Sequence, residues 1–190
     1  MENKMYQIDS FYRGCYNSAM KQNIVLIGFM ASGKSTLGRV LQKELGWPLI
    51  STDEYIEEKE GRKITQIFKD SGEGRFRALE HQAIEDITKS DKPVIIDCGG
   101  GVVLNPDNIA ILKRTGTLIY LSCRPEVIDE RIHLQPTRPL LDVPDPRAKI
   151  EALLNERTSL YNQADLTFDT SDGDMVRVAR EVLQKVEHDK

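Results

Sequence analysis

Cysteine, histidine and tryptophan are scarce in this 190-residue sequence. The three cysteines, Cys15, Cys98 and Cys123, are widely spaced and form no CxxC pair, which argues against both a disulfide framework and a zinc site. His81 and His133 have no metal-ligand spacing either, and we expect them to be ordinary helix residues. Such cysteine usage is typical of a reducing cytoplasm, where we expect the protein to reside.

Long hydrophobic runs are also missing. No apolar run approaches the roughly 20 residues that a membrane helix needs, and the N-terminus has no apolar signal core. The formal net charge of −4 argues against general binding of nucleic acid. We therefore expect neither a membrane nor a nucleic-acid partner, and any site for an anion must be a local basic pocket.

The length and the composition are those of one globular domain, with 39% hydrophobic and 29% charged residues. Residues 1–19 show no clear period, whereas Met20 comes just ahead of the first apolar run. We expect a single domain over residues 20–190 and interpret 1–19 as an N-terminal extension of uncertain order. A short helix docked through its aromatic residues is the alternative. No heptad repeat indicates assembly, so we expect a monomer.

Short apolar runs alternate with amphipathic helical patterns along the domain. The runs predict buried strands at Ile24–Ile27, Pro48–Ser51, Val94–Asp97, Leu118–Leu121 and Leu166–Phe168. Helical spacing between them predicts helices, the first ending at Gly46 and two others beginning at Asn105-Pro106 and Asp145-Pro146. This alternation predicts an α/β fold, a parallel sheet with helices on both faces.

One segment interrupts the alternation. Residues 134–146, "LQPTRPLLDVPDP", contain four prolines and fit neither the helical nor the strand period. A loop of this length inside a compact domain is typically a lid or a binding loop, so we expect a mobile lid here.

The stretch from Gly28 to Ser35 matches G-x-x-x-x-G-K-S between an apolar strand and an amphipathic helix. The glycines allow successive backbone N–H groups to face phosphate oxygens, and the N-terminus of the helix attracts the anion further. Lys34 is placed to reach the outer phosphates, and the Ser35 hydroxyl to bind Mg²⁺. A simple glycine turn with a surface lysine is the alternative. The loop predicts binding of the phosphates of ATP or GTP.

Asp53 follows the second predicted strand, at the edge where ligands collect in open α/β sheets. Its carboxylate could orient an acceptor hydroxyl and take its proton. The alternative is an N-cap for the helix expected over Glu54–Glu60.

Two further features suggest how the acceptor is held. Arg77 and Glu80 are one helical turn apart, so the carboxylate can hold the guanidinium as a fixed fork for a substrate carboxylate; an ordinary solvated pair is the alternative. The third strand ends in Gly99–Gly101, an entropically costly run that suits close approach of a substrate to the backbone. A flexible hinge is the other interpretation of these glycines.

In this order, the phosphate loop, the aspartate after strand two, "GEGRFRALE", "GGG", "RPLL" and "RTSLY" resemble the shikimate kinase family over residues 23–170. The resemblance implies transfer of the γ-phosphoryl group of ATP to the 3-hydroxyl of shikimate, on the route to chorismate and the aromatic amino acids. It also implies a nucleoside-monophosphate-kinase-like P-loop NTPase fold with a five-stranded parallel sheet.

The resemblance carries roles over to matching residues. Lys34, Asp53 and Arg138 would be catalytic, with Asp53 as the base and Arg138 on the lid. The acceptor would contact, besides Asp53, Arg77, Gly99, Gly100, Gly101 and Arg157. The nucleotide would contact Gly28, Ala31, Ser32, Gly33, Lys34, Ser35, Thr36, Arg131, which would stack on adenine, and Arg138.

Residue-level alternatives stay open for two of these arginines. Arg157 falls on a helix with an apolar face and could only cover that face. Arg138, beside Pro139, could be a plain surface residue of the loop.

Three positions depart from the family's usual pattern. Ala31 stands where glycine is usual, a mild change if φ is negative there. Ser51 replaces the first aspartate of "DxD", which normally helps to hold the water molecules around magnesium. Asp97 occupies a position where the family usually has a small neutral residue, and we expect its carboxylate to replace Ser51 near the metal. The expected magnesium-binding residues are therefore Ser35 and Asp97. A carboxylate bonded to the amides of the glycine run is the alternative.

The sequence thus predicts an ATP- and Mg²⁺-dependent shikimate kinase. Another small-molecule kinase, such as a gluconate kinase, would share the phosphate loop but not the full series of motifs. A weakly catalytic regulator that binds nucleotide or shikimate is the second alternative, supported by Ser51 alone.

Overall fold

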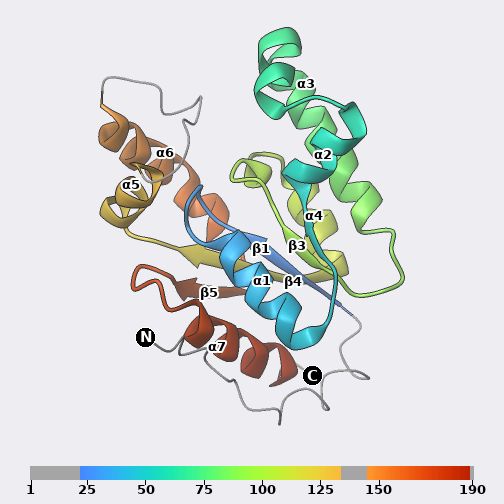
Figure 1. Cartoon of the computed structure of the whole chain (residues 1–190), viewed down its shortest axis with the longest axis vertical. Coiled ribbons are helices and arrows are strands. Elements are labelled where there is room, and N and C mark those ends of the chain that lie inside the picture. Colours follow the sequence, from blue (N-terminus) through green and yellow to red (C-terminus); the bar gives the residue numbers. More distant parts are fainter. Residues whose placement is uncertain (1–21, 134–144, 189–190) are drawn as a thin grey trace, which may run out of the picture.

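The computed structural model describes residues 22–133 and 145–188, and its strands form one five-stranded parallel sheet in the order β2-β3-β1-β4-β5. Figure 1 shows the sheet between layers of helices. The strands are β1 Asn23–Ile27, β2 Leu49–Ser51, β3 Ile95–Asp97, β4 Gly116–Ser122 and β5 Leu166–Asp169. All five predicted strands are confirmed.

Helices follow the strands in alternation, as the sequence pattern predicts. They are α1 Lys34–Leu45, α2 Thr52–Glu60, α3 Ile64–Ile87, α4 Pro106–Thr115, α5 Pro125–His133, α6 Pro146–Tyr161 and α7 Met175–His188, with a short 3₁₀ helix, η2, over Val102–Leu104. The helix α3 is interrupted at Gly72, whose φ of 76° is outside the helical region. Within the described residues, no helix is both long enough and apolar enough to span a membrane.

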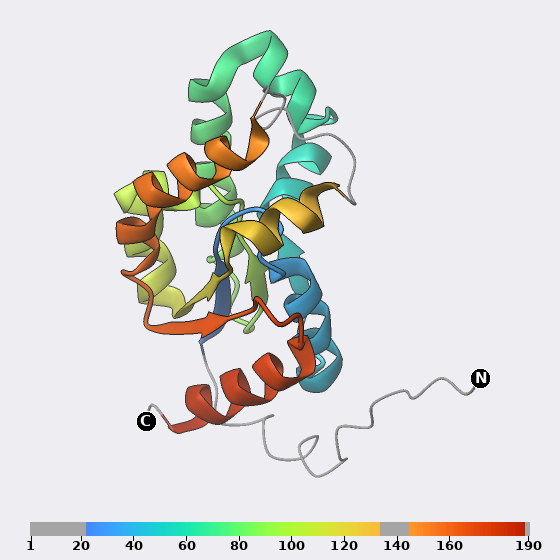
Figure 2. The ribbon, with the colours of Figure 1, turned by 90° about the vertical axis from the view of Figure 1, so that its left-hand side faces the viewer.

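The alternation of side chains along β1 builds a core on each face of the sheet. Ile24 and Leu26 face one way and pack with α1 and α7, whereas Val25 and Ile27 face the other and pack with α3 and α4. Figure 2 shows α5 (gold) and α6 (orange) running beside each other near the same end of the sheet as α2 and α3. The result is a sheet buried on both sides whose carboxyl ends stay open to a ligand.

Helix caps follow the sequence signals in most places. Gly46 ends α1 in a left-handed conformation with φ 70°, and the side chains of Asn105 and Asp145 accept backbone N–H groups at the starts of α4 and α6. At α2 the structure excludes the alternative role that was considered for Asp53. Its cap is Ser51, whose hydroxyl accepts the Glu54 amide, and Asp53 lies inside the first turn. The interpretation of Asp53 as an N-cap is therefore wrong.

Some sequence predictions fall on residues that the structure does not describe. These are the extension over 1–19, Cys15, most of the segment expected to form a lid, and Arg138. Of the two remaining cysteines, Cys98 is buried and Cys123 is half-buried.

Candidate active site

The phosphate loop follows β1 at the carboxyl end of the sheet and leads directly into α1. Gly28 and Gly33 have φ angles of 148° and 98°, values that residues with a side chain rarely adopt. A Cβ at Gly28 would lie 2.6 Å from the Leu121 carbonyl oxygen, so the turn also needs the space. The buried Lys34 donates to the carbonyls of Gly28 and Phe29, each at 3.0 Å, which holds its ammonium group beside the loop.

Ala31 adopts a strained conformation in this loop. Its φ is 58°, and it is the only residue other than glycine with a positive φ in the described part of the chain. The replacement of glycine was expected to be mild only at a negative φ, and that condition is not met. The Ala31 carbonyl accepts the Nη1 donor of Arg131 at 3.1 Å, a contact that helps to keep the strained peptide in place.

The Ser35 hydroxyl and the Asp97 carboxylate meet at the N-terminus of α1. Ser35 Oγ donates to Asp97 Oδ2 at 2.5 Å. Asp97 pairs in register with Ser51 of the neighbouring strand, so a carboxylate lies one strand away from the position where the family usually has one. The alternative in which Asp97 binds the amides of the glycine run gains no support, because the Gly99 amide donates to Thr52 Oγ1 at 2.9 Å.

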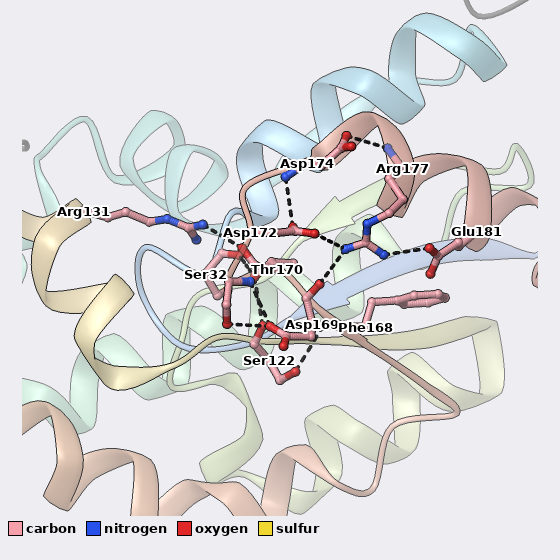
Figure 3. A network of polar contacts seen from close by, with 11 residues as sticks. Ser32, Ser122, Arg131, Phe168, Asp169, Thr170, Asp172, Asp174, Arg177 and Glu181 are labelled. Carbon is pink, nitrogen blue, oxygen red and sulfur yellow. Dashed lines mark hydrogen bonds and ion pairs between the residues drawn. The ribbon is translucent and has the colours of Figure 1, made fainter.

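A cavity of about 610 Å³ opens over the phosphate loop. Loop residues through Thr36, the end of β3 and the turn after β5 line it. Arg131 also lines it, and its Nη2 donates to the Thr170 carbonyl at 2.6 Å. The guanidinium thus joins the phosphate loop to the turn after β5, an arrangement that sequence offsets did not reveal (Figure 3).

A second cavity of about 220 Å³ lies beside the first. Arg77 from α3 and Arg157 from α6 both line it, although 80 residues separate them in the chain. Asp53, Gly99 and Gly100 line both cavities, so a ligand in one can meet a ligand in the other there. The structure therefore brings together the described residues that the sequence assigns to the acceptor.

Arg77 is held by carboxylates. Its Nη1 lies 2.8 Å from Glu80 Oε2, and its Nη2 lies 2.9 Å from Glu73 Oε1. Burial acts to lower the pKa of Arg77, but the carboxylates of Glu80 and Glu73 together outweigh burial and raise it. Burial raises the pKa of Glu80, which is 1% exposed, against the opposing pull of Arg77. The predicted pair is confirmed, and it is not an ordinary solvated pair.

Arg157 lies in the wall of the second cavity with 6% of its surface exposed. Its Nη1 approaches the Gly100 carbonyl at 3.5 Å, and its buried Nε has no hydrogen-bond partner among the described residues. A guanidinium in the wall of a cavity that also has an unsatisfied donor is suited to an anion.

Two of the three glycines after β3, Gly99 and Gly101, have close neighbours where a side chain would begin, whereas a Cβ at Gly100 would meet its nearest atom, the Met30 amide nitrogen, at 3.4 Å. A Cβ at Gly99 would lie 2.8 Å from Asp53 Oδ1 and 3.0 Å from Glu80 Oε1. A Cβ at Gly101 would collide with the Arg77 guanidinium. The glycines therefore let the acceptor-site side chains pack against bare backbone, which favours the interpretation of close approach over that of a hinge.

Several residues of the site were missed at the level of sequence. Tyr161 donates its hydroxyl to the Gly100 carbonyl at 2.6 Å and stacks on Tyr120, with ring centroids 4.9 Å apart. Phe68 and Ile64 supply apolar walls to the second cavity. Tyr161 stands in the motif "RTSLY" but was assigned no role. The only signal of Phe68 and Ile64 was helical periodicity, which does not separate a cavity wall from a core.

A family model described as shikimate kinase matches residues 30–187. Shikimate kinase from Caldanaerobacter subterraneus is 44% identical over 86% of this chain and 95% of its own, and that of Dehalococcoides mccartyi is 41% identical over 88% and 97%. The structure of a shikimate kinase from Acinetobacter baumannii in complex with shikimate has a TM-score of 0.84 and 35% identity, covering 89% of this chain and 94% of its own.

A gluconokinase structure from Sinorhizobium meliloti is more distant. Its TM-score is 0.55 at 18% identity, covering 88% of this chain and 92% of its own, a likeness that shows a shared fold and nothing more.

Proposed function

The chain belongs to the shikimate kinase family, and from that membership we propose that it transfers the γ-phosphoryl group of ATP to the 3-hydroxyl of shikimate. The observation that carries the proposal is the second cavity, where Arg77 and Arg157 converge beside the phosphate loop. In a protein of net charge −4, two converging guanidinium groups create the local positive charge that a carboxylate substrate needs.

The acceptor end of the site follows from this geometry. Arg77, fixed by Glu80, and Arg157, with its unsatisfied Nε, grip the carboxylate of shikimate. The backbone of Gly99–Gly101 forms the floor under its ring. Asp53 lies where the two cavities meet, so its carboxylate orients the 3-hydroxyl and accepts the proton as the oxygen attacks the γ-phosphorus.

The nucleotide end uses the phosphate loop. The amides of the loop and the N-terminus of α1 hold the phosphates, and Lys34 turns from the Gly28 and Phe29 carbonyls to the outer phosphates. The remaining nucleotide contacts are Ala31, Ser32, Ser35, Thr36 and Arg131, the last beside the adenine. The catalytic and nucleotide-binding role of Arg138 is proposed from the family resemblance alone, since this residue lies outside the described part of the chain.

The residues at the mouth of the loop fit a magnesium ion. A hydroxyl and a carboxylate, from Ser35 and Asp97, offer oxygen atoms beside the place of the phosphates, and oxygen is the ligand type that Mg²⁺ takes. Within the described residues no cluster of three potential metal-binding side chains occurs, which suits an ion held largely by the nucleotide. A bound ion would neutralise charge on the β- and γ-phosphates.

A coupled assay tests the proposal. The purified protein with ATP and Mg²⁺ is expected to release ADP with shikimate and not with gluconate, and mass spectrometry should identify a phosphorylated shikimate. Lys34→Met provides the inactive control. ADP release with gluconate would support the alternative of another small-molecule kinase, and no ADP release with either acceptor would favour a binding protein. We further propose that the enzyme works as a cytoplasmic monomer, which gel filtration and cell fractionation can check.

A further inference from the structure

The carbonyls of the phosphate loop are held from outside by residues that the proposed mechanism does not use. Thr170, in the turn after β5, is fully buried. Its hydroxyl lies 2.7 Å from the Ser32 carbonyl and 2.9 Å from the Ser122 carbonyl, while its own backbone N–H already donates to Ser122. The single hydroxyl proton is therefore available for the Ser32 carbonyl.

The bond to Ser32 sets the direction of the next amide. In a planar trans peptide the C=O and the following N–H point in opposite directions. When Thr170 holds the Ser32 carbonyl on the outer side of the loop, the Gly33 N–H is turned to the inner side, where Gly33 lines the larger cavity. Over residues 22–133 and 145–188, the Gly33 amide has no hydrogen-bond acceptor, so it is available to a phosphate.

The turn that carries Thr170 is itself fixed from the far side (Figure 3). Arg177 of α7 donates to the Asp169 carbonyl at 3.2 Å and to the Asp172 carboxylate at 2.9 Å, and its other terminal nitrogen lies 2.7 Å from Glu181. The Asp174 amide donates to Asp172 Oδ1 at 3.1 Å. The hydroxyl of Thr170 is thus presented by an ordered turn, so little conformational entropy is lost when a ligand binds.

We propose that Thr170 is a positioning residue for the nucleotide: through the Ser32 carbonyl it aims the Gly33 amide at the phosphates. The turn after β5, far from the loop in sequence, thereby sets the affinity of the phosphate loop. The proposal rests on nucleotide binding at this loop and adds a residue that touches neither substrate.

Replacing Thr170 tests this directly. Thr170→Val keeps the shape and removes the hydroxyl, whereas Thr170→Ser keeps it. Without the hydroxyl the Gly33 amide is no longer aimed at the phosphates, and the loss of its one hydrogen bond to them corresponds to about a tenfold rise in the dissociation constant of ADP, measured by titration calorimetry. We expect that rise for the valine variant, a value within about twofold of wild type for the serine variant, and an unchanged dissociation constant for shikimate in both.

Thr115→Val is the matched control. Its hydroxyl donates to the Ile111 carbonyl at 2.9 Å on α4, away from both cavities. An unchanged affinity for ADP in Thr170→Val, or an equal loss for ADP and shikimate, would overturn the proposal. Failure of the wild type to bind ADP would instead contradict the proposed function itself.

A measurement on the wild type covers the case in which the valine variant does not fold. In a ¹⁵N-labelled sample the Gly33 amide proton should move downfield on addition of ADP, because a hydrogen bond to phosphate deshields it. A Gly33 resonance that does not move would overturn the proposal without any variant.

Discussion

Asp97→Asn separates the metal from both substrates. The carboxylate accepts the Ser35 hydroxyl at 2.5 Å at the mouth of the phosphate loop, in register with Ser51 on β2. Asparagine keeps the volume and one acceptor oxygen but removes the charge. We expect the variant to need much more Mg²⁺ while its affinity for shikimate stays the same, since Asp97 does not line the second cavity.

The size of the effect follows from what is lost. Outer-shell partners of a metal ligand typically contribute about 10- to 100-fold in metal affinity. A hydrogen bond to a charged group contributes about 1.5–3 kcal/mol, which corresponds to the same range. Because asparagine can still accept a hydrogen bond from Ser35, we expect a loss of Mg²⁺ affinity at the lower end of this range, about tenfold.

Two readouts measure the loss of metal affinity. The first is the Mg²⁺ concentration at half-maximal rate with saturating ATP and shikimate. The second is the affinity for Mn²⁺ in the presence of ADP, followed by electron paramagnetic resonance, which does not depend on turnover. Asp91→Asn, in the exposed turn before β3, is the control.

A second substitution makes the test reciprocal. Ser51→Asp in the Asp97→Asn background returns a carboxylate to the neighbouring strand, at the position in register with Asp97, and should restore most of the Mg²⁺ affinity. An unchanged Mg²⁺ requirement in Asp97→Asn would refute the reasoning, as would a failure of both readouts to respond to the added aspartate.

Three further predictions follow. Arg157→Lys removes a planar fork from the acceptor cavity and should raise KM for shikimate about tenfold or more in steady-state assays, leaving KM for ATP within about twofold. Burial raises the pKa of Glu80, so its contribution to stability is present below the ordinary carboxylate pKa and is lost as pH rises through the raised value. Urea unfolding from pH 5 to 8 should therefore show a stability advantage of wild type over Glu80→Gln that shrinks with pH; a constant difference would contradict it. Ala31→Gly relieves the positive φ at an entropic cost and should raise the free energy of unfolding by about 0.5–1 kcal/mol; a loss of stability would show that Ala31 is not strained.

The sequence predicts the fold well because each element carries its own local signal. Strands of buried β-branched and aliphatic residues could be placed within one or two positions, and Asn105 and Asp145 before proline marked helix starts that the structure confirms. The cap of α2 could not be identified from the sequence, because Ser51, Thr52 and Asp53 are all good capping residues in a row. Only the backbone shows that the helix begins at Thr52.

For the site, some residues could be predicted from the sequence and others are recognised only in the structure. Arg77 could be predicted for the acceptor from its spacing to Glu80 and Arg157 from the family resemblance, and the structure brings both to the second cavity. Tyr161 and Thr170 could not be predicted, because they act through backbone carbonyls of Gly100 and Ser32, and no side-chain pattern reveals which carbonyl a hydroxyl reaches. Such contacts depend on tertiary packing between segments more than 60 residues apart.

The departures from the family pattern all fall on one side of the site. Ala31, Ser51 and Asp97 line the cavity over the phosphate loop, whereas the described acceptor-side residues match the family motifs. Each departure has a structural counterpart close by: Arg131 holds the Ala31 carbonyl, and Asp97 lies in register with Ser51. The two cavities share Met30, Asp53, Gly99 and Gly100, but Ala31, Ser35 and Asp97 line only the larger one. Changes in how the nucleotide and metal are held therefore need not alter how the acceptor is chosen. This separation predicts that substitutions on the nucleotide side change affinities for Mg²⁺ and nucleotide while preference for shikimate over gluconate persists, and a variant there that lost this preference would contradict it.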